Sequence, residues 1–259
     1  MATLLGQPIS YPTAYDPAIL EGIDRALGRQ DLHLPAGMTG FDRWMCYELS
    51  WLSDADLPQC GVMCMDVPAG TPRIVESKSL KLYLNSLYRS CFATKEDVLA
   101  CIGRDLAPIL GGTPLLKLYG PQQWVSELNP AEPQGYCLDC ARAQSLPADA
   151  GDEFEYRVWT NQFRSLCPVT GQPDWATFEV CWQGVPVDLQ WIAQYLWSYR
   201  EHAGFHEQCV EAIFSHLLET MGPSSLMVRA SFTRRGGIDI SPCRAFGREA
   251  EPAPRRYRQ

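Results

Sequence analysis

Strand-like and helical segments recur in the same order in the two halves of this chain of 259 residues. In each half, strand-like runs are followed by two segments whose apolar residues recur at helical spacing, and then by further strand-like residues. A short stretch rich in turn-forming residues, 145–152, separates the halves. This order predicts an α+β fold in which two β-β-α-α-β-β modules form antiparallel sheets with helices packed on one face.

The sequence pattern also predicts where the elements and domains lie. In the first half we expect strands at 44–52, 60–67 and 115–119, and helices at 77–88 and 95–110. In the second half we expect strands at 155–163, 177–182, 226–232 and 238–242, and helices at 188–199 and from 205 onward. The domains predicted on this basis are an N-terminal module over 1–144, a linker over 145–152, a C-terminal module over 153–246 and a flexible tail over 247–259.

Charge and hydropathy argue against two classes of protein. The net charge is −8, and basic residues cluster only at Arg234–Arg235 and Arg255–Arg258, whereas nucleic-acid binders carry a basic surface for phosphates. No run approaches the roughly 18 apolar residues of a membrane helix, and the first ten residues do not resemble a secretory signal. We therefore expect a cytoplasmic protein that acts on a small molecule and binds neither nucleic acid directly nor a membrane.

The chain contains eleven cysteines, which we expect to be mostly reduced and buried in the cytosol. Cys137 and Cys140 form a C-x-x-C pair, but a structural zinc site needs two more ligands at similar spacing. None stands out, so we expect a packed pair and no metal site. The sequence also has no glycine-rich dinucleotide fingerprint after a strand and no P-loop, so a nicotinamide cofactor would bind by other means.

Three segments carry side chains that are suited to catalysis or ligand binding. The first, Glu76–Tyr83, opens a predicted helix and places Lys78 and Lys81 near its first turn, where the helix dipole disfavours cations. Free backbone N–H groups at a helix start bind anions, so the segment predicts a phosphate cradle. The alternative interpretation is a solvated face of an amphipathic helix.

The second segment, Ser165–Trp175, is a proline- and glycine-containing loop between two strands. It carries Cys167, which a loop makes accessible enough to act as a thiolate nucleophile. Asp174 follows seven residues later, close enough to fold back toward the sulfur and share its proton. The alternative is a buried cysteine in a turn.

The third segment is Phe205–Glu207, where His206 and Glu207 begin the last predicted helix. A helix start favours the charged form of a carboxylate, and a buried carboxylate suits the N–H edge of a purine-like base. The alternative is the ordinary preference of helix starts for acidic residues.

Taken together, four runs resemble a known family. The runs are ESKSLKLY at 76–83, CPVTGQPDW at 167–175, FHEQC at 205–209 and RRGGIDISP at 234–242. They resemble the two-module 7-cyano-7-deazaguanine reductases, the QueF-type nitrile oxidoreductases of the tunnelling-fold superfamily. The resemblance extends from about Tyr15 to Arg244 and implies two tandem tunnelling-fold modules.

The resemblance also implies an activity. Members of this family use NADPH to reduce the nitrile of 7-cyano-7-deazaguanine by four electrons to the aminomethyl base, an intermediate of queuosine biosynthesis in a tRNA modification pathway. They act on the free deazapurine base, which agrees with the acidic charge. We expect this chain to be such an oxidoreductase and to form a homodimer.

Roles for individual residues follow from the same resemblance. Cys167 would attack the nitrile carbon to form a covalent thioimide, Asp174 would donate a proton, and His206 would assist. The residues expected to bind the base are Val75, Glu76, Ser77, His206 and Glu207. The residues expected to bind NADPH are Ser77, Lys78, Arg235 and Gly236. One departure is Leu166, where the family usually has asparagine, which puts one polar contact of the loop in doubt.

Two other enzyme classes remain as alternatives. A cysteine-dependent nitrile or amide hydrolase would also use Cys167, but would release ammonia and ignore NADPH. A zinc cyclohydrolase-like member of the same superfamily would need a metal site, and only four histidines are present. A non-catalytic ligand-binding module is the remaining possibility.

Overall fold

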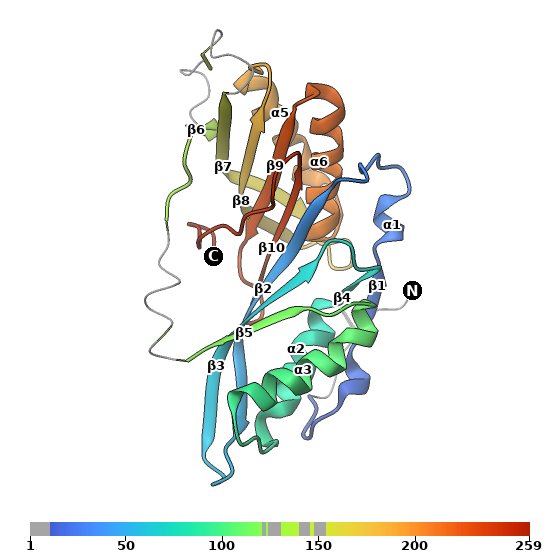
Figure 1. Ribbon diagram of the computed structural model, residues 1–259, viewed down its shortest axis with the longest axis vertical. Coiled ribbons are helices and arrows are strands. Elements are labelled where there is room, and N and C mark those ends of the chain that lie inside the picture. Colours follow the sequence, from blue (N-terminus) through green and yellow to red (C-terminus); the bar gives the residue numbers. More distant parts are fainter. Residues whose placement is uncertain (1–10, 121–122, 124–130, 140–145, 148–153) are drawn as a thin grey trace. The chain divides into compact units, whose positions relative to one another are not determined.

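The computed structural model describes residues 11–120, 123, 131–139, 146–147 and 154–259 (Figure 1). Contacts between backbone positions divide the chain into two compact units. Unit 1 comprises Met1–Ala26, Asp42–Asn129 and Arg234–Asp239, and unit 2 comprises Leu27–Phe41, Pro130–Thr233 and Ile240–Gln259.

This division differs from the expected modules in three places. The segment Leu27–Phe41 groups with unit 2, and so does the chain from Pro130 onward, although we expected the N-terminal module to extend to residue 144. The segment Arg234–Asp239 groups with unit 1. Two strands, β2 (Thr39–Leu52) and β10 (Ile238–Phe246), have residues in both units. Because a strand keeps its alternating pattern along its whole length, the sequence shows no break at these boundaries.

Unit 1 contains a three-stranded arrangement in the order β5-β3-β2 and a separate two-stranded sheet of β1 and β4. β3 and β5 are antiparallel, with Cys64 opposite Lys117, and β1 and β4 are antiparallel as well. Besides β2, the elements are η1 (Pro17–Ile19), β1 (Gly22–Asp24), β3 (Pro58–Pro68), β4 (Arg73–Val75), α2 (Ser77–Ser86), η2 (Leu87–Arg89), α3 (Lys95–Leu110) and β5 (Leu115–Tyr119).

Local sequence explains why α3 occupies its predicted range. Thr94 caps the helix by accepting a hydrogen bond from the Asp97 backbone N–H, and the Asp97 carboxylate accepts from the Thr94 N–H in return. Val98, Ile102 and three further residues at helical spacing are buried, so the helix is held by one apolar face.

Unit 2 contains five strands in the order β10-β9-β8-β7-β6. β8 is antiparallel to β7 and to β9, whereas the two-residue β6 is parallel to β7, which departs from the purely antiparallel sheet we expected. Besides β10, the elements are α1 (Ala26–Arg29, at the boundary with unit 1), β6 (Tyr136–Cys137), β7 (Glu155–Leu166), β8 (Pro173–Gln183), α5 (Leu189–Ser198), η4 (Tyr199–Glu201), α6 (His206–Met221) and β9 (Ser225–Phe232).

The two faces of this sheet are covered differently. Figure 1 shows α5 and α6 together on one face. The side chains of Phe178, Val180 and Trp182 enter the core formed with these helices, together with Ile192 and Phe214. Successive strand residues point to opposite faces, and on the other face Cys181 packs in a smaller cluster with Met227, Cys243 and Ala245.

The C-terminal segment 247–259 covers part of that second face, so it is not the flexible tail we expected. The side chain of Arg256 is buried and forms an ion pair with Glu179 of β8. Arginines near a chain end are usually solvated, and nothing in the local sequence indicates that one of them has a buried partner.

The fold class is α+β, as predicted, and each long predicted element has a counterpart. The short elements β1, β4, α1 and β6 were missed, because two to four residues do not reveal a helical or a strand period.

Candidate functional site

Cys167 lies in the hairpin loop between β7 and β8 of unit 2. Its backbone N–H donates to the Gln172 carbonyl and its carbonyl accepts from the Gly171 N–H, both at 2.9 Å. The thiol is free and the residue is half-buried. The ladder pairs Ser165 with Asp174, so these two side chains face the same side of the hairpin. Cys167 follows Ser165 by two residues, in the loop that leads to β8. One hairpin therefore carries both the predicted nucleophile and the predicted proton donor.

Asp174 and His206, two of the predicted site residues, contact each other through their side chains. The Asp174 Oδ1 lies 3.4 Å from the His206 Nε2, and both side chains are largely buried. The imidazole stacks on the ring of Phe232, with ring centroids 3.8 Å apart and planes inclined by 10°. His206 is thus held between a carboxylate and an aromatic face, which restricts its ring to one orientation.

The start of α6 places Glu207 beside this pair. The first turn is closed by Gln208, whose side-chain oxygen accepts from the Phe205 N–H at 3.1 Å. Glu207 is the second residue of the helix and is buried. Cys209 follows it, and burial raises the pKa of its thiol to about 12, so this neighbouring cysteine stays protonated.

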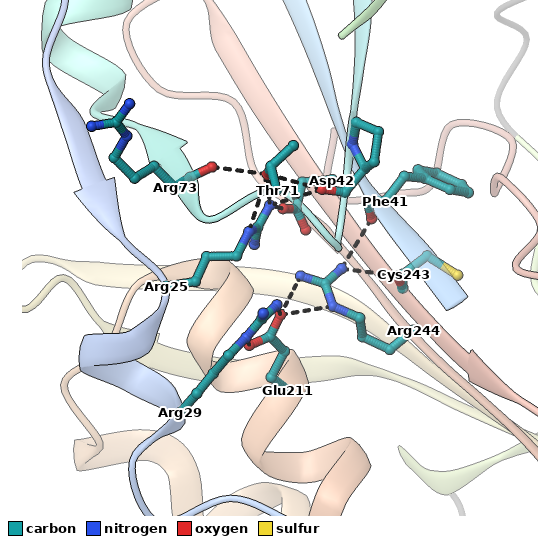
Figure 2. Close-up of polar contacts among 10 residues, drawn as sticks. Arg25, Arg29, Phe41, Asp42, Thr71, Arg73, Glu211, Cys243 and Arg244 are labelled. Carbon is teal, nitrogen blue, oxygen red and sulfur yellow. Dashed lines mark hydrogen bonds and ion pairs between the residues drawn. The ribbon is translucent and has the colours of Figure 1, made fainter. Parts of the chain in front are cut away.

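One turn further along α6, Glu211 anchors the helix through two arginines (Figure 2). Arg29 donates to both carboxylate oxygens at 2.8 and 2.6 Å, and the fully buried Arg244 donates to Oε1 at 2.9 and 2.7 Å. Burial alone would raise the pKa of Glu211, but the hydrogen bond from Arg29 and the charges of both arginines outweigh it and lower the pKa to about 2. Glu211 is therefore ionised in the folded protein at any ordinary pH.

Unit 1 has its own buried ion pair. Arg25 donates to Asp42 at 2.5 Å, and its backbone N–H donates to the Pro72 carbonyl (Figure 2). The hydroxyl of Thr71 lies 3.4 Å from the same guanidinium and donates to the Arg73 carbonyl at 2.9 Å. These contacts fix β1 beside β4, the strand that leads into the predicted binding residues.

Val75 ends β4, and Glu76 is the N-cap of α2. The Glu76 carboxylate accepts from the backbone N–H groups of Lys78 at 3.0 Å and Ser79 at 2.7 Å. Two of the N–H groups that we expected to form a phosphate cradle are therefore occupied by the helix's own cap. The cradle interpretation is wrong for these N–H groups, and the side chains of Ser77 and Lys78 remain as candidates.

The loop Arg234–Gly237 lies beside α2 and β2 within unit 1. The Arg234 guanidinium stacks over the Tyr47 ring at 4.6 Å. A side chain at Gly236 would come within 3.1 Å of the Lys81 Nζ, and one at Gly237 within 2.5 Å of the Glu48 carboxyl carbon. Both glycines have left-handed backbones, with φ of 55° and 79°, which disfavour other residues. The loop thus needs its two glycines to approach these side chains.

The predicted residues fall into two groups. Unit 2 brings together Cys167, Asp174, His206 and Glu207. Unit 1 brings together Val75, Glu76, Ser77, Lys78, Arg235 and Gly236. Sequence analysis missed Phe232, because a phenylalanine at the end of a strand looks like any core residue. It also gave no role to Gln208, although a glutamine at the third helical position signals a capping interaction.

No group of three or more metal-binding side chains gathers among the residues that the structure describes. Cys137 is half-buried, whereas Cys140 lies outside those residues, so the predicted packed pair stays a prediction. In the same part of the chain, no helix is long and apolar enough to cross a membrane.

Comparison with known proteins connects this geometry to a family. Residues 11–117 match the family described as nitrile reductase, 7-cyano-7-deazaguanine-reductase N-term, and residues 173–251 match the QueF-like proteins. The NADPH-dependent 7-cyano-7-deazaguanine reductase of Bordetella parapertussis is 42% identical over 96% of this chain and 95% of its own length. The Acinetobacter baumannii (strain AYE) protein of the same name is 38% identical over 97% of this chain and 96% of its own. With two family matches in order and relatives of this similarity over nearly its whole length, the chain belongs to the QueF family of nitrile reductases.

Proposed function

We propose that this chain catalyses the NADPH-dependent, four-electron reduction of 7-cyano-7-deazaguanine to 7-aminomethyl-7-deazaguanine, a step of queuosine biosynthesis. The observation that carries the proposal is that the β7–β8 hairpin carries both Cys167 and Asp174, with the Asp174 Oδ1 3.4 Å from the His206 Nε2. A nucleophile, a proton carrier and a group that orients the carrier are the parts that covalent catalysis on a nitrile needs.

The first step is attack of the Cys167 sulfur on the nitrile carbon. One π bond of the nitrile breaks, a carbon–sulfur bond forms, and the nitrogen takes up a proton from Asp174. Asp174 recovers a proton from the thiol, so the thioimide contains the atoms of the thiol and the nitrile and nothing else. This covalent step replaces a poor hydride acceptor by a more electrophilic carbon–nitrogen double bond.

His206 and Phe232 serve this step by orientation. The stacked imidazole holds its Nε2 against Asp174, which keeps the carboxyl group on the side of the hairpin where the sulfur lies. A positioned proton donor contributes typically about 10²–10⁴ in rate. The first reduction would turn the thioimide carbon into a tetrahedral carbon that carries both sulfur and nitrogen. Its carbon–sulfur bond then breaks, Cys167 leaves as the thiol with a proton from the nitrogen, and the imine that remains is the acceptor for the second reduction.

We assign the base to Glu207 and His206 within unit 2, while the expected roles of Val75, Glu76 and Ser77 of unit 1 stay predictions. The substrate presents a guanine-like edge with several N–H donors, and a carboxylate accepts two of them with charge. Glu207 is buried at the start of α6, and Gln208 closes the first turn of that helix. Glu76 accepts two backbone N–H groups of α2, so we assign the main contact with the base to Glu207.

The residues of unit 1 fit a phosphate-bearing cofactor. Lys78 and Lys81 on α2 and Arg234 and Arg235 on the neighbouring loop are all cations. Gly236 of this loop lies close to Lys81, since a Cβ at this position would be 3.1 Å from the Lys81 Nζ. Charge-assisted contacts of this kind suit phosphate. Among them, Ser77, Lys78, Arg235 and Gly236 would hold NADPH, which when bound supplies the two hydrides of the reduction.

The test is the stoichiometry of the reaction. Protein, 7-cyano-7-deazaguanine and NADPH are mixed, the loss of reduced-cofactor absorbance is followed, and the product is identified by mass spectrometry. We expect two NADPH consumed per nitrile and the aminomethyl base as product, because a nitrile takes up four electrons on the way to an amine. Consumption of one NADPH per nitrile contradicts the proposal, and release of ammonia without NADPH consumption identifies a hydrolase instead.

A further inference from the structure

The last residues of the chain lie against the strand that carries Asp174. After β10 the backbone turns at Gly247, which has a left-handed φ of 67° and where a Cβ would lie 2.3 Å from the Ser224 carbonyl oxygen. The chain then runs over the face of the unit 2 sheet opposite the helices. Arg229 of β9 donates to the Glu251 carbonyl at 3.2 Å on the way, so the segment is tied to the sheet before it reaches its end.

Arg256 anchors the chain end to β8. Its guanidinium donates to both oxygens of Glu179 at 2.8 Å and to the Ala131 carbonyl at 2.8 Å. The residue is only 4% exposed, and Arg229 donates to the same carboxylate. The geometry of a buried, bidentate ion pair is well defined, so this pair fixes the position of the chain end along β8.

Arg258 then reaches the start of β8. Its Nε donates to the Asn161 carbonyl at 2.8 Å, at the irregularity of β7 between Thr160 and Phe163. Its guanidinium lies 4.9 Å from the centre of the Trp175 ring, a distance at which cation–π attraction operates. Gln259 donates to Ser241 at 2.9 Å. The chain end therefore joins the bulge of β7 to Trp175.

Trp175 and Asp174 are neighbours that point to opposite faces of one strand. Asp174 faces α6 and contacts His206, whereas Trp175 faces the chain end. The pair lies next to the end of the ladder, since Leu166 opposite Pro173 is the last register position of the hairpin. Strand ends beside a loop open more readily than strand centres, so a contact that holds Trp175 also restrains Asp174.

We propose that Arg258, seated by Arg256, is a positioning residue for Asp174: by holding Trp175 on one face of β8, it keeps the Asp174 carboxyl group against His206 on the other. This inference deepens the proposed function, on which it rests. A displacement of about 1 Å at a reacting group costs as much as 10²-fold in rate. The C-terminal residues thus act on proton delivery without touching the substrate.

The experiment is a double-mutant cycle in the full-length protein. Arg258→Ala is made alone and in an Asp174→Asn background, with Arg258→Lys as the conservative variant. Glu249→Ala is the control, since Glu249 lies in the same C-terminal segment and is exposed, whereas the Tyr257 ring contacts the Arg258 guanidinium. For each protein we measure kcat and KM for the base and for NADPH, the rate of adduct formation on Cys167 without NADPH, and urea unfolding.

We expect Arg258→Ala to lower kcat and the adduct rate by about ten- to a hundredfold while both KM values stay within a few-fold. Arg258→Lys should recover part of the loss, and Glu249→Ala should behave as the wild type. In the Asp174→Asn background, Arg258→Ala should cause no further loss, because residues that act through one group are not additive.

The same factor of loss in both backgrounds overturns the inference, because a general structural role weakens both equally. A wild-type rate for Arg258→Ala overturns it as well. If the wild-type protein itself forms neither adduct nor amine, the proposed function is wrong, and this inference is wrong because it depends on that function. Measuring wild-type turnover first separates these cases.

Discussion

The helices α2 and α6 both begin beside a buried glutamate, and the two carboxylates have different tasks. Glu76 precedes α2 and accepts two backbone N–H groups of its first turn. Glu207 is the second residue of α6, whose first turn is closed by Gln208 instead. Glu76 is therefore used by its own helix as a cap, whereas Glu207 lies two positions after Phe205, the N-cap residue of α6, and Gln208 closes that first turn. The position of a glutamate within the first turn thus decides whether it caps its helix.

The hairpins that precede these helices differ as well. The loop between β7 and β8 carries Cys167 and leads to Asp174, whereas the loop between β2 and β3, residues 53–57, contains two aspartates and no cysteine. Both units thus repeat an order of elements, but only the hairpin of unit 2 carries a nucleophile. Two units with the same order of elements need not share a catalytic function. Reacting side chains often lie in loops, and the sequence of a loop can change without changing the fold.

The sharpest test of this difference removes the sulfur. Cys167→Ala should abolish turnover and the covalent adduct, because the other cysteine of the hairpin, Cys181, is buried and its burial raises the pKa of its thiol to about 12. Mass spectrometry of protein plus nitrile base without NADPH should show the adduct on the wild type only. Cys60→Ala, at an exposed cysteine of unit 1, is the matched control and should keep full activity. An adduct that persists in Cys167→Ala would place the nucleophile on another cysteine.

A second test separates binding from proton transfer in the same hairpin. Asp174→Asn keeps the shape of the side chain but cannot donate a proton as an acid, so we expect turnover to fall by about 10²–10⁴. Calorimetric titration should show affinity for the base within a few-fold of the wild type. Unchanged turnover would reduce Asp174 to a turn residue.

A third test concerns the contribution of Glu211 to stability. Unlike α2, which is capped by a carboxylate, α6 is anchored near its start by the ion pairs of Glu211 with Arg29 and Arg244. The lowered pKa of about 2, against an ordinary value of 4.5, contributes stability that is fully present above pH 4.5 and is lost as the pH falls toward 2. At about 1.4 kcal/mol per pKa unit, the loss is on the order of 3 kcal/mol.

Urea unfolding between pH 5 and 2.5 measures this loss. Glu211→Gln should unfold more easily at neutral pH, because it leaves the buried Arg244 without its charged partner, and its free energy of unfolding should depend less on pH over this range. An equally steep pH dependence in the variant would assign the acid sensitivity to other carboxylates.

The last test compares the two glutamates directly. Glu207→Leu should lose most affinity for the base, since an unpaired buried donor on the substrate costs about 1–3 kcal/mol, while the unfolding free energy stays near that of the wild type. Glu76→Leu should lower the unfolding free energy by about 0.5–2 kcal/mol through loss of the cap.

Titrations in a Cys167→Ala background exclude covalent capture in both cases. If Glu207→Leu binds the base as the wild type does, Glu207 leaves the proposed site and Glu76 becomes the remaining anchor. If Glu207→Leu is destabilised as much as Glu76→Leu, the two carboxylates have the same structural task.

Much of the fold was predictable because each long helix or strand has a periodic pattern of apolar residues within its own sequence. The helix at 95–110 lies where its apolar spacing and its Thr94–Asp97 capping box place it, and β5 spans the predicted 115–119. The strand β8 proved longer than predicted, since its first residues, Pro173 and Asp174, look like loop residues until their pairing partners in β7 are known. Elements of two to four residues carry no periodic signal at all.

The candidate site divides in the same way. Cys167, Asp174, His206 and Glu207 stood out in sequence because unusual residues occurred at loop and helix starts, in runs that resemble one family. The stack of Phe232 under His206 did not stand out, because its partner lies on a different element. We expected free N–H groups at the start of α2, but the Glu76 side chain folds back over the helix and accepts two of them. The sequence does not show how this side chain is oriented.

The sequence by itself determined the order of the long elements and the family to which the chain belongs, because each depends on residues within a few positions of one another. Only the tertiary structure decided that the chain end packs against the sheet. The pairing of Arg256 with Glu179 and the contact of Arg258 with Trp175 join residues far apart in the chain. Their energies depend on burial and on which face of a strand each side chain occupies, and neither quantity exists until the sheet has formed.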